Sequence, residues 1–268
     1  MSEIQHDLGD KGLMEVLKKN IPDDADEGNL LLVTDKSTGS IQTEFLQRYL
    51  TEINPELIIE TGTNFCCFPG FVKTFLPDVK VITFGRDKFS GPCVDAVNEY
   101  FGEDYITFIE GDSTVTMPQY VDQFECKKSK NSAAWMDGGH TLPVAYSDLV
   151  HLYKYGVDHI FVDDINPKWP WQTLLPLYRF VVDYPYEIVD MSRDKRGIAY
   201  IRKSKTRIPL TEDQKKESAD IFNESGVPQP APQQQQRVAL PDHLMSQIND
   251  WMAAEKAKVE PVDNDAVD

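Results

Sequence analysis

The sequence predicts an α/β protein with a doubly wound, mostly parallel sheet of seven strands and an antiparallel strand at one edge. Two observations carry this prediction. Short apolar runs alternate along the chain with segments of helical periodicity, which is the pattern of strands and helices in a parallel sheet. The last two apolar runs have no helical segment between them, which predicts an antiparallel addition at one edge.

The first strand lies in the stretch LIIETGTN at residues 57–64. An apolar run that ends in turn residues is typical of a buried strand in a parallel sheet. Glu60 ends this run, and Gly62 builds the following turn. An acid there accepts hydrogen bonds from hydroxyl or ammonium groups, which a phosphate does not offer. We therefore expect the loop to bind a nucleoside rather than a pyrophosphate.

The remaining elements follow from periodicity and from helix-ending residues. Ser40 is a plausible cap, Pro69 suits a first helical turn, and Gly156 is a helix stop. Helices are expected around residues 13–17 and at 40–53, 69–76, 94–101, 143–155 and 172–180. The other strands are expected at 79–84, 105–109, 133–136, 159–162, 186–189 and 198–201.

The chain is expected to consist of four segments. Residues 1–39 are expected to form an irregular N-terminal cap, and residues 40–203 the α/β domain. Residues 204–239 contain the run PQPAPQQQQ, which is typical of an extended linker. Residues 240–268 are expected to form an amphipathic helix, which docks on the domain, on a partner protein or on another copy, followed by a disordered acidic tail.

The net charge of −17, from 27 basic and 44 acidic residues, argues against non-specific binding to nucleic acid or to anionic membranes. No apolar stretch reaches the roughly 20 residues that span a bilayer, so we expect a cytoplasmic protein. The four cysteines (Cys66, Cys67, Cys93 and Cys126) lack CxxC spacing, which favours reduced thiols over a zinc site.

Acids lie at or just after the ends of four predicted strands. They are Glu60, Asp112, Asp137, Asp163 and Asp164. Neighbouring parallel strands lie about 4.8 Å apart, so these carboxylates are expected to converge on one edge of the sheet. A single acid at such a place is commonly a turn residue, but five of them indicate a ligand site.

The strand-end motifs occur in a fixed order: ETG at 60–62, EGDS at 110–113, DGGHT at 137–141 and DD at 163–164. This order resembles the class I S-adenosylmethionine-dependent methyltransferases, which have a Rossmann-like fold. Within them it is most similar to the branch of macrocin O-methyltransferase-like enzymes, which act on sugars and small natural products. The resemblance covers about residues 40–203.

The resemblance implies a set of cofactor contacts. Glu60 and Gly62 would flank the methionine part of S-adenosylmethionine, and Asp112 and Ser113 would lie near the adenine. The expected cofactor-binding set also includes Asn64, Asp87 and Asp137.

The resemblance also implies a reaction site. In metal-dependent members, acids matching Asp137, Asp163 and Asp164 bind a magnesium ion that orients a substrate diol, and carboxylate oxygens suit that ion. The ion would lower the pKa of a bound hydroxyl. Asp137 and His140 are the expected catalytic residues, with His140 as the general base. The alternative roles are simpler: Asp163 and Asp164 cap a turn, and His140 bonds to the loop backbone.

The chain differs from the family pattern at three positions. Cys66 stands where a further loop glycine is usual, and its side chain is expected to crowd the cofactor's approach. Gly85 stands at the end of the second strand, where an acid usually binds the ribose, and Asp87 follows two residues later. Gly139 stands where sugar O-methylating relatives carry a base.

The sequence therefore favours a methyltransferase that transfers a methyl group to the oxygen of a small hydroxylated acceptor. The alternative is a methyltransferase-like scaffold without turnover, indicated by the changed loop and by the tail. A nicotinamide-dependent dehydrogenase is disfavoured, because Gly62 is not followed by the GxxG spacing of a pyrophosphate loop. The WPW stretch at 169–171 either lines an acceptor pocket or packs under the sheet edge.

Overall fold

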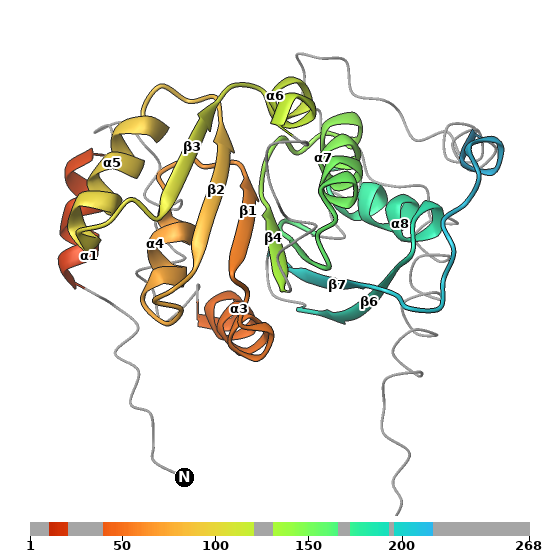
Figure 1. The fold of residues 1–268 in the computed structure, drawn as a ribbon, viewed down its shortest axis with the longest axis horizontal. Helices are drawn as coiled ribbons and strands as arrows, with labels where there is room; N and C mark the ends of the chain where they lie inside the picture. The colour runs from red at the N-terminus through yellow and green to blue at the C-terminus, as the bar shows by residue number, and fades with distance from the viewer. Residues whose placement is uncertain (1–10, 21–39, 121–130, 166–171, 193–195, 217–268) are drawn as a thin grey trace, which may run out of the picture.

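The computed structural model describes residues 11–20, 40–120, 131–165, 172–192 and 196–216. Within these ranges seven strands form one sheet, in the order β3-β2-β1-β4-β5-β7-β6. The strands are β1 (Leu57–Thr61), β2 (Lys80–Gly85), β3 (Ile106–Glu110), β4 (Ser132–Met136), β5 (His159–Val162), β6 (Tyr186–Met191) and β7 (Ala199–Lys203). Figure 1 shows the sheet with its flanking helices.

The sheet is mixed, as predicted. The strands β1 to β5 pair in parallel, whereas β7 pairs antiparallel with both β5 and β6. The antiparallel strand thus lies between β5 and the outermost strand β6. Because β7 is reversed, β6 runs in the same direction as β5, and the β6–β7 turn lies at the end of the sheet where β4 and β5 also finish.

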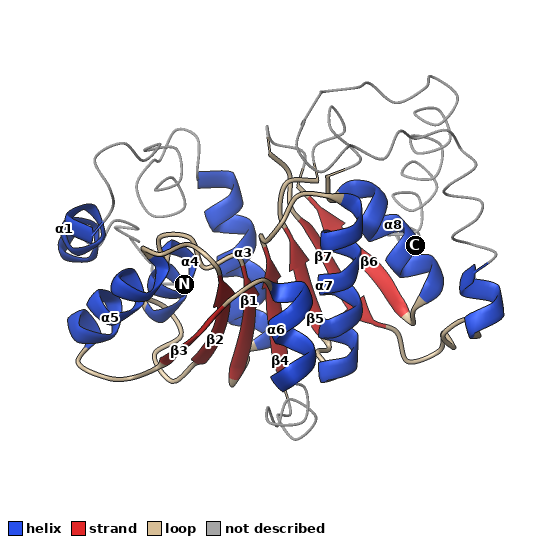
Figure 2. Cartoon of the chain, turned by 90° about the horizontal axis from the view of Figure 1, so that it is seen from above, coloured by secondary structure: helices blue, strands red, loops and turns tan. Residues whose placement is uncertain are grey.

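The helices in the described ranges are α1 (Lys11–Asn20), α3 (Ser40–Ile53), α4 (Cys67–Lys73), α5 (Ser90–Phe101), α6 (Ser113–Tyr120), α7 (Leu142–Tyr155) and α8 (Leu174–Asp183). They cover the sheet on both sides, as the view from above shows (Figure 2).

Side chains of the central strands point alternately to the two faces of the sheet, and each face carries one half of the core. Ile58 belongs to a buried cluster that includes residues of α1, α3, α4 and α5, whereas its neighbour Ile59 belongs to a second cluster with residues of α6, α7 and α8. Successive side chains of a strand point to opposite faces, so a fully apolar strand needs a helical layer on each side. The buried central strands of the sheet therefore confirm the doubly wound prediction.

Several helices differ from the sequence prediction. Helix α5 begins at Ser90 rather than at residue 94, and α8 spans Leu174–Asp183 rather than residues 172–180. The α4 helix begins at Cys67, two residues before Pro69, because Cys66 adopts a left-handed conformation (φ 60°) at its start. The α6 helix was not predicted at all. Met117 is its only buried residue and Pro118 lies inside it, so its sequence lacks the apolar periodicity that identifies a helix.

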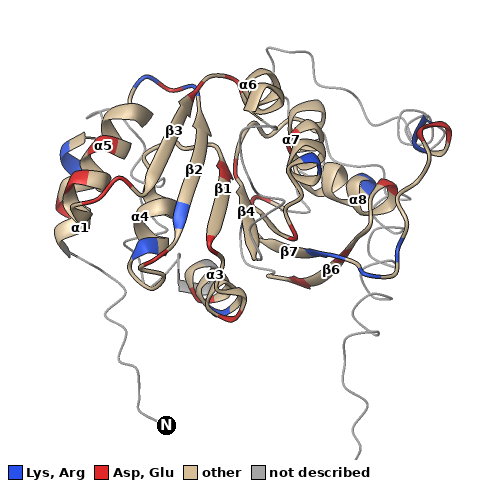
Figure 3. Cartoon of the chain, in the orientation of Figure 1, with Lys and Arg blue, Asp and Glu red and all other residues tan. Residues whose placement is uncertain are grey.

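Leu13 and Leu17 of α1 are fully buried, so this N-terminal helix contributes to the core. None of the described helices is long and apolar enough to cross a membrane. Basic and acidic positions are distributed over the described helices, strands and loops (Figure 3). The predicted amphipathic segment at 240–268 and the WPW stretch lie outside the described residues.

Candidate functional site

The carboxyl ends of β1, β4 and β5 bring the central loops together. Thr61 pairs with Met136 across the sheet, and Met136 pairs with Val162. The amide of Asp137 then donates to the Thr61 carbonyl (2.9 Å), and the amide of Asp163 donates to the Met136 carbonyl (3.0 Å). The residues that follow these strands are consequently adjacent, as the strand-end motifs indicated.

Gly62 lets two of these loops meet. Its φ is +92°, and a Cβ built on it would lie 2.1 Å from the carbonyl oxygen of Asp137. Its amide donates to the carbonyl of Phe84 (2.8 Å), which fixes the loop against β2 as well. Only glycine combines this backbone conformation with so close an approach.

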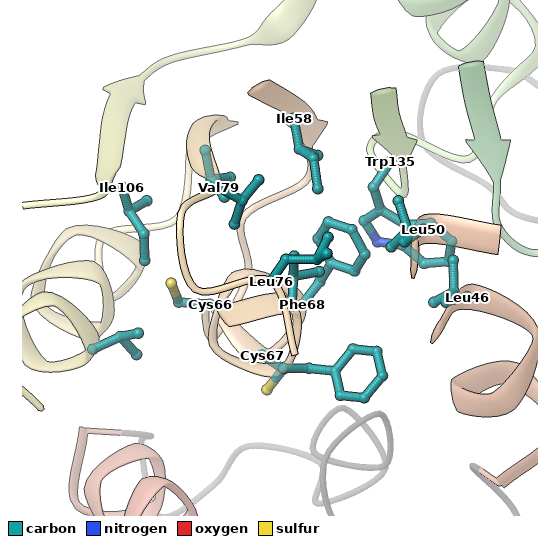
Figure 4. Close-up of a cluster of buried hydrophobic side chains, with 14 of the residues drawn as sticks. Leu46, Leu50, Ile58, Cys66, Cys67, Phe68, Leu76, Val79, Ile106 and Trp135 are labelled. Carbon is teal, nitrogen blue, oxygen red and sulfur yellow. The ribbon is translucent and has the colours of Figure 1, made fainter. Parts of the chain in front are cut away.

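The loop keeps a left-handed backbone at Asn64 (φ 43°) and Cys66 (φ 60°). Cys66 is fully buried, and its side chain lies in the core near Val79 and Ile106 (Figure 4). Burial raises the pKa of this thiol well above its usual value, which disfavours the thiolate that a nucleophile requires. The side chain of Cys66, which was expected to crowd the cofactor, thus packs into the core.

Glu60 lies inside the molecule rather than on its surface. It is 1% exposed, and it accepts a hydrogen bond from the Thr83 hydroxyl (2.5 Å). Burial raises its pKa well above the usual value, and the charge of Asp137 adds to this shift although Thr83 opposes it. The Thr83 hydroxyl also lies 2.7 Å from that of Thr63, so Glu60 ends a buried polar chain that leads to the loop.

Thr63 occupies the space beside Gly85, where the family pattern places an acid. A Cβ on Gly85 would lie 2.5 Å from Thr63 Oγ1 and 3.3 Å from Phe108. A larger residue at position 85 would therefore displace Thr63. Asp87 is exposed on the following loop, where its carbonyl accepts the amide of Ser90 (2.9 Å). Asp87 therefore remains an exposed residue of the loop that follows β2.

Asp112 and Ser113 lie at the start of α6. Asp112 Oδ1 accepts hydrogen bonds from the amide (2.9 Å) and hydroxyl (2.6 Å) of Thr114. The Thr114 hydroxyl and amide, with a contribution from Arg86, lower the pKa of Asp112. The Ser113 hydroxyl donates to Asp148 Oδ1 (2.8 Å).

Asp148, which sequence analysis missed, is fully buried on α7 under the β4 loop. A Cβ on Gly138 would lie 2.9 Å from Asp148 Oδ2, so the backbone of the DGGHT motif passes directly over this carboxyl. Burial raises the pKa of Asp148 to about 7. No sequence signal separates it from an ordinary polar position on a helix.

His140 lies between two carboxylates. Its Nε2 is 3.3 Å from Asp137 Oδ1, and its Nδ1 is 3.3 Å from Asp164 Oδ2. Burial opposes the charged ring, but the hydrogen bond with Asp137 and the charges of Asp137 and Asp164 outweigh it and raise the pKa of His140. The structure thus assembles three of the predicted residues into one cluster.

Asp163 and Asp164 face Arg196, a residue of the β6–β7 turn. Arg196 Nε donates to Asp164 Oδ1 (2.8 Å) and its NH2 group donates to Asp164 Oδ2 (3.1 Å), which makes a bidentate pair. The same NH2 group is 3.6 Å from Asp163 Oδ2. Asp163 is 2% exposed, and burial together with the charges of Asp137 and Asp164 raises its pKa despite Arg196.

Arg196 was also missed by sequence analysis, although a signal existed. The final pair of strands was predicted to add antiparallel, and Val162 at the end of β5 pairs with Ala199 at the start of β7. Residues just before β7 must then lie beside the acids that follow β5. The basic character of the turn at residues 193–196 could have identified the counter-charge.

The predicted magnesium ligands are only partly assembled. Three side chains could hold an ion together: Asp137, His140 and Asp164. Each offers one ligand atom, and these atoms lie within 4.8 Å of one another. Asp163 is not part of this group, and both oxygens of Asp164 are already paired with Arg196. The side chains therefore fit a guanidinium better than an all-oxygen magnesium shell.

No protein-family model matches the sequence, and no curated protein matches it. Solved structures with the same fold are found at low sequence identity. A putative O-methyltransferase from Klebsiella pneumoniae is 16% identical, with 73% of this chain and 91% of that chain covered and a TM-score of 0.51. The O-methyltransferase TomG from Streptomyces achromogenes, in complex with SAM, is 13% identical, with 71% and 90% covered and a TM-score of 0.52.

An O-methyltransferase from Bacillus cereus, in complex with SAH, is 16% identical over 72% of this chain and 91% of that chain, with a TM-score of 0.54. At such identities the likeness concerns the fold. The chain has the same Rossmann-like fold as these proteins.

Proposed function

We propose that the protein is an S-adenosylmethionine-dependent methyltransferase that acts on a hydroxyl oxygen of a small acceptor. The observation that carries the proposal is the position of His140, held between Asp137 and Asp164 at the strand ends beside the Gly62 loop. The shared fold with O-methyltransferases supports it. In an open α/β sheet this edge is where ligands bind.

The loop geometry is compatible with the cofactor. Gly62, Thr63 and Asn64 would present backbone rather than bulky side chains, since Cys66 is packed into the core. Asp112 and Ser113 would border the adenine at the start of α6, and Asp137 would face the methionine end. Asp87 would have to reach the ribose from its exposed loop. Glu60 would act from beneath the loop, through Thr83 and Thr63.

In the proposed reaction, a side chain of the protein removes the proton from the acceptor hydroxyl. The bound cofactor supplies an electrophilic methyl group. His140 in its neutral form would take the hydroxyl proton on one ring nitrogen, while a carboxylate orients the ring through the other nitrogen. Asp137 and Asp164 raise the pKa of His140, so the neutral base becomes more abundant as pH rises through a value above the ordinary 6.5. We expect methyl transfer to increase over that range.

Cofactor binding is tested by thermal unfolding with S-adenosylhomocysteine. A ligand at about 100 times its dissociation constant should add about 2.7 kcal/mol to the free energy of unfolding. Nicotinamide dinucleotide serves as the control and should leave the melting temperature unchanged. Absence of any shift at millimolar S-adenosylhomocysteine would contradict the proposed function.

The catalytic role is tested by His140→Gln. Removing a general base lowers turnover about 10²- to 10⁴-fold, whereas S-adenosylhomocysteine affinity should change little. His159→Gln is the matched control, because His159 lies in β5 next to Tyr200 and away from the strand-end acids. Small hydroxylated compounds, including sugars, form the first acceptor screen, because the order of the strand-end motifs resembles the macrocin O-methyltransferase-like branch.

A second candidate is a methyltransferase-like scaffold without turnover. Gly85 stands at the strand end where an acid usually holds the ribose, and Thr63 fills the space beside it. A stable protein partner together with no S-adenosylhomocysteine shift would favour the scaffold. A shift with S-adenosylhomocysteine would favour the enzyme.

A further inference from the structure

Arg196 stands in the strand-end acid cluster at the place where a divalent cation would bind. We propose that the Arg196 guanidinium is the resident cation of Asp163 and Asp164, so that the wild-type protein neither binds nor requires a divalent metal there. Removal of Arg196 would convert the same acids into a metal site. The proposal deepens the proposed function, because it specifies how this site balances its charge.

The contacts of Asp164 exclude an ion in the wild-type arrangement. The fork of Arg196 reaches both carboxylate oxygens, at 2.8 and 3.1 Å. A bidentate guanidinium occupies the in-plane positions that a hard cation needs. A metal ion would have to displace this pair, whose side chains are only partly exposed (43% for Arg196 and 16% for Asp164).

The backbone holds both partners in place. Gly197, next to Arg196, has φ +78°, and its carbonyl accepts the amide of Ile165 (3.2 Å). Asp164 has a left-handed φ of 54°, and its carbonyl accepts the hydroxyl of Thr173. A non-glycine residue rarely adopts this conformation unless its surroundings impose it. The ion pair is therefore built into the two loops.

The cluster without Arg196 would offer hard oxygen ligands. Asp137, His140 and Asp164 already place ligand atoms within 4.8 Å of one another. Asp163 is 2% exposed, its Oδ2 is 3.6 Å from Arg196, and its Oδ1 has no hydrogen-bond partner among the described residues. Loss of the guanidinium would leave these carboxylates without their cation, a situation that a divalent ion relieves.

The test measures binding of Mn²⁺ alone by titration calorimetry, on the full-length protein without cofactor. We expect no saturable site in the wild type at millimolar Mn²⁺. Arg196→Gln should gain a site with roughly tenfold or greater affinity over any background binding, the size of effect that neighbouring groups have at metal sites. Asp164→Asn, added to Arg196→Gln, should remove the gain.

The matched control is Arg202→Gln, which deletes the same charge from an exposed pair with Glu187 (2.7 Å) on β6 and β7. It should not gain Mn²⁺ binding. Saturable Mn²⁺ binding by the wild type that Asp164→Asn abolishes would overturn the proposal, and this measurement does not depend on the folding of Arg196→Gln. A folded Arg196→Gln without any gain would also overturn it.

The outcome is independent of the cofactor test. A wild-type metal site together with an S-adenosylhomocysteine shift would leave the methyltransferase proposal standing and remove the role of Arg196. If S-adenosylhomocysteine gives no shift and Arg196→Gln gains Mn²⁺ binding, the role of Arg196 stands and the methyltransferase proposal is contradicted.

Discussion

Single residues determine how closely the strand-end loops approach one another. Gly62 is the clearest case, because a Cβ at this position would lie 2.1 Å from the carbonyl oxygen of Asp137, far inside van der Waals contact. Cys66 is the opposite case. It has a left-handed backbone although it is not glycine, and its side chain packs into the core. The loop thus depends on glycine where two backbones meet and tolerates a side chain where the backbone faces the core.

Gly62→Ala should destabilise the protein more than Gly102→Ala. Both glycines have positive φ, but a Cβ on Gly102 would meet no atom of the described residues within 4 Å. Gly102→Ala should cost about 1–2 kcal/mol from its backbone conformation alone. Gly62→Ala should cost about 1–3 kcal/mol more, because the loops must separate. Urea unfolding measures both, and equal costs would show that the close approach is relaxed at little expense.

Asp148 should make stability depend on pH. Its folded pKa of about 7 exceeds the unfolded value of 3.8, so the folded state binds the proton more tightly. Its contribution to stability is then greatest below about pH 4 and is lost as pH rises towards 7. The loss has an upper limit of about 4 kcal/mol, since one pKa unit corresponds to about 1.4 kcal/mol.

Asp148→Asn removes this titration. The stability of the variant relative to wild type should rise between about pH 4 and 7 and then level off. The exposed Asp104→Asn is the control and should show no comparable trend. A flat difference for Asp148→Asn, measured by urea unfolding at several pH values, would argue against a buried titrating carboxyl.

At the scale of elements, α6 depends on its cap rather than on an apolar face. Met117 is its only buried residue, whereas Asp112 bonds both the amide and the hydroxyl of Thr114. The helix borders the proposed adenine region, so its stability affects the site directly.

Asp112→Ala should lower the free energy of unfolding by about 1 kcal/mol, and Asp112→Asn should retain most of it, because asparagine also caps helices. The pair separates capping from charge. If S-adenosylhomocysteine affinity falls in both variants, the carboxylate contacts the ligand; if it falls only in Asp112→Ala, the cap positions the helix. Equal stability of the two variants would remove the capping role.

At the scale of the whole molecule, sheet order decides where the protein is most resistant to opening. The strands β1 and β4 lie in the middle of the sheet with buried neighbours on both sides, while β3 and β6 form its edges. Local opening of a sheet begins where hydrogen bonds are exposed.

Backbone amides of Ile59 and Ala134 should therefore exchange with deuterium at least about tenfold more slowly than those of β6. Native-state hydrogen exchange with residue resolution checks this expectation. Faster exchange in β1 than in β6 would mean that the antiparallel pair, rather than the parallel centre, is the most stable unit.

Much of the fold could be read from sequence, because local patterns reflect it. The apolar run before Glu60 predicted β1, and Gly156 predicted the end of α7, where it has φ 83°. Helix α6 could not be predicted, since a capped helix with one buried side chain leaves no apolar period. The site could be predicted only in part for a similar reason. Motifs are found in the order of the chain, whereas the partners that balance a charge are neighbours in space.

The sequence by itself determined the mixed seven-stranded sheet and the convergence of Glu60, Asp137, Asp163 and Asp164 on its carboxyl edge, because strand ends and the presence or absence of a helical segment between two strands are visible in the local sequence. Tertiary structure alone decided that Glu60 is buried and that Arg196 pairs with Asp164. It also decided that Thr63 fills the space beside Gly85. These contacts join residues up to 32 positions apart, and their energies depend on burial and on distance in space.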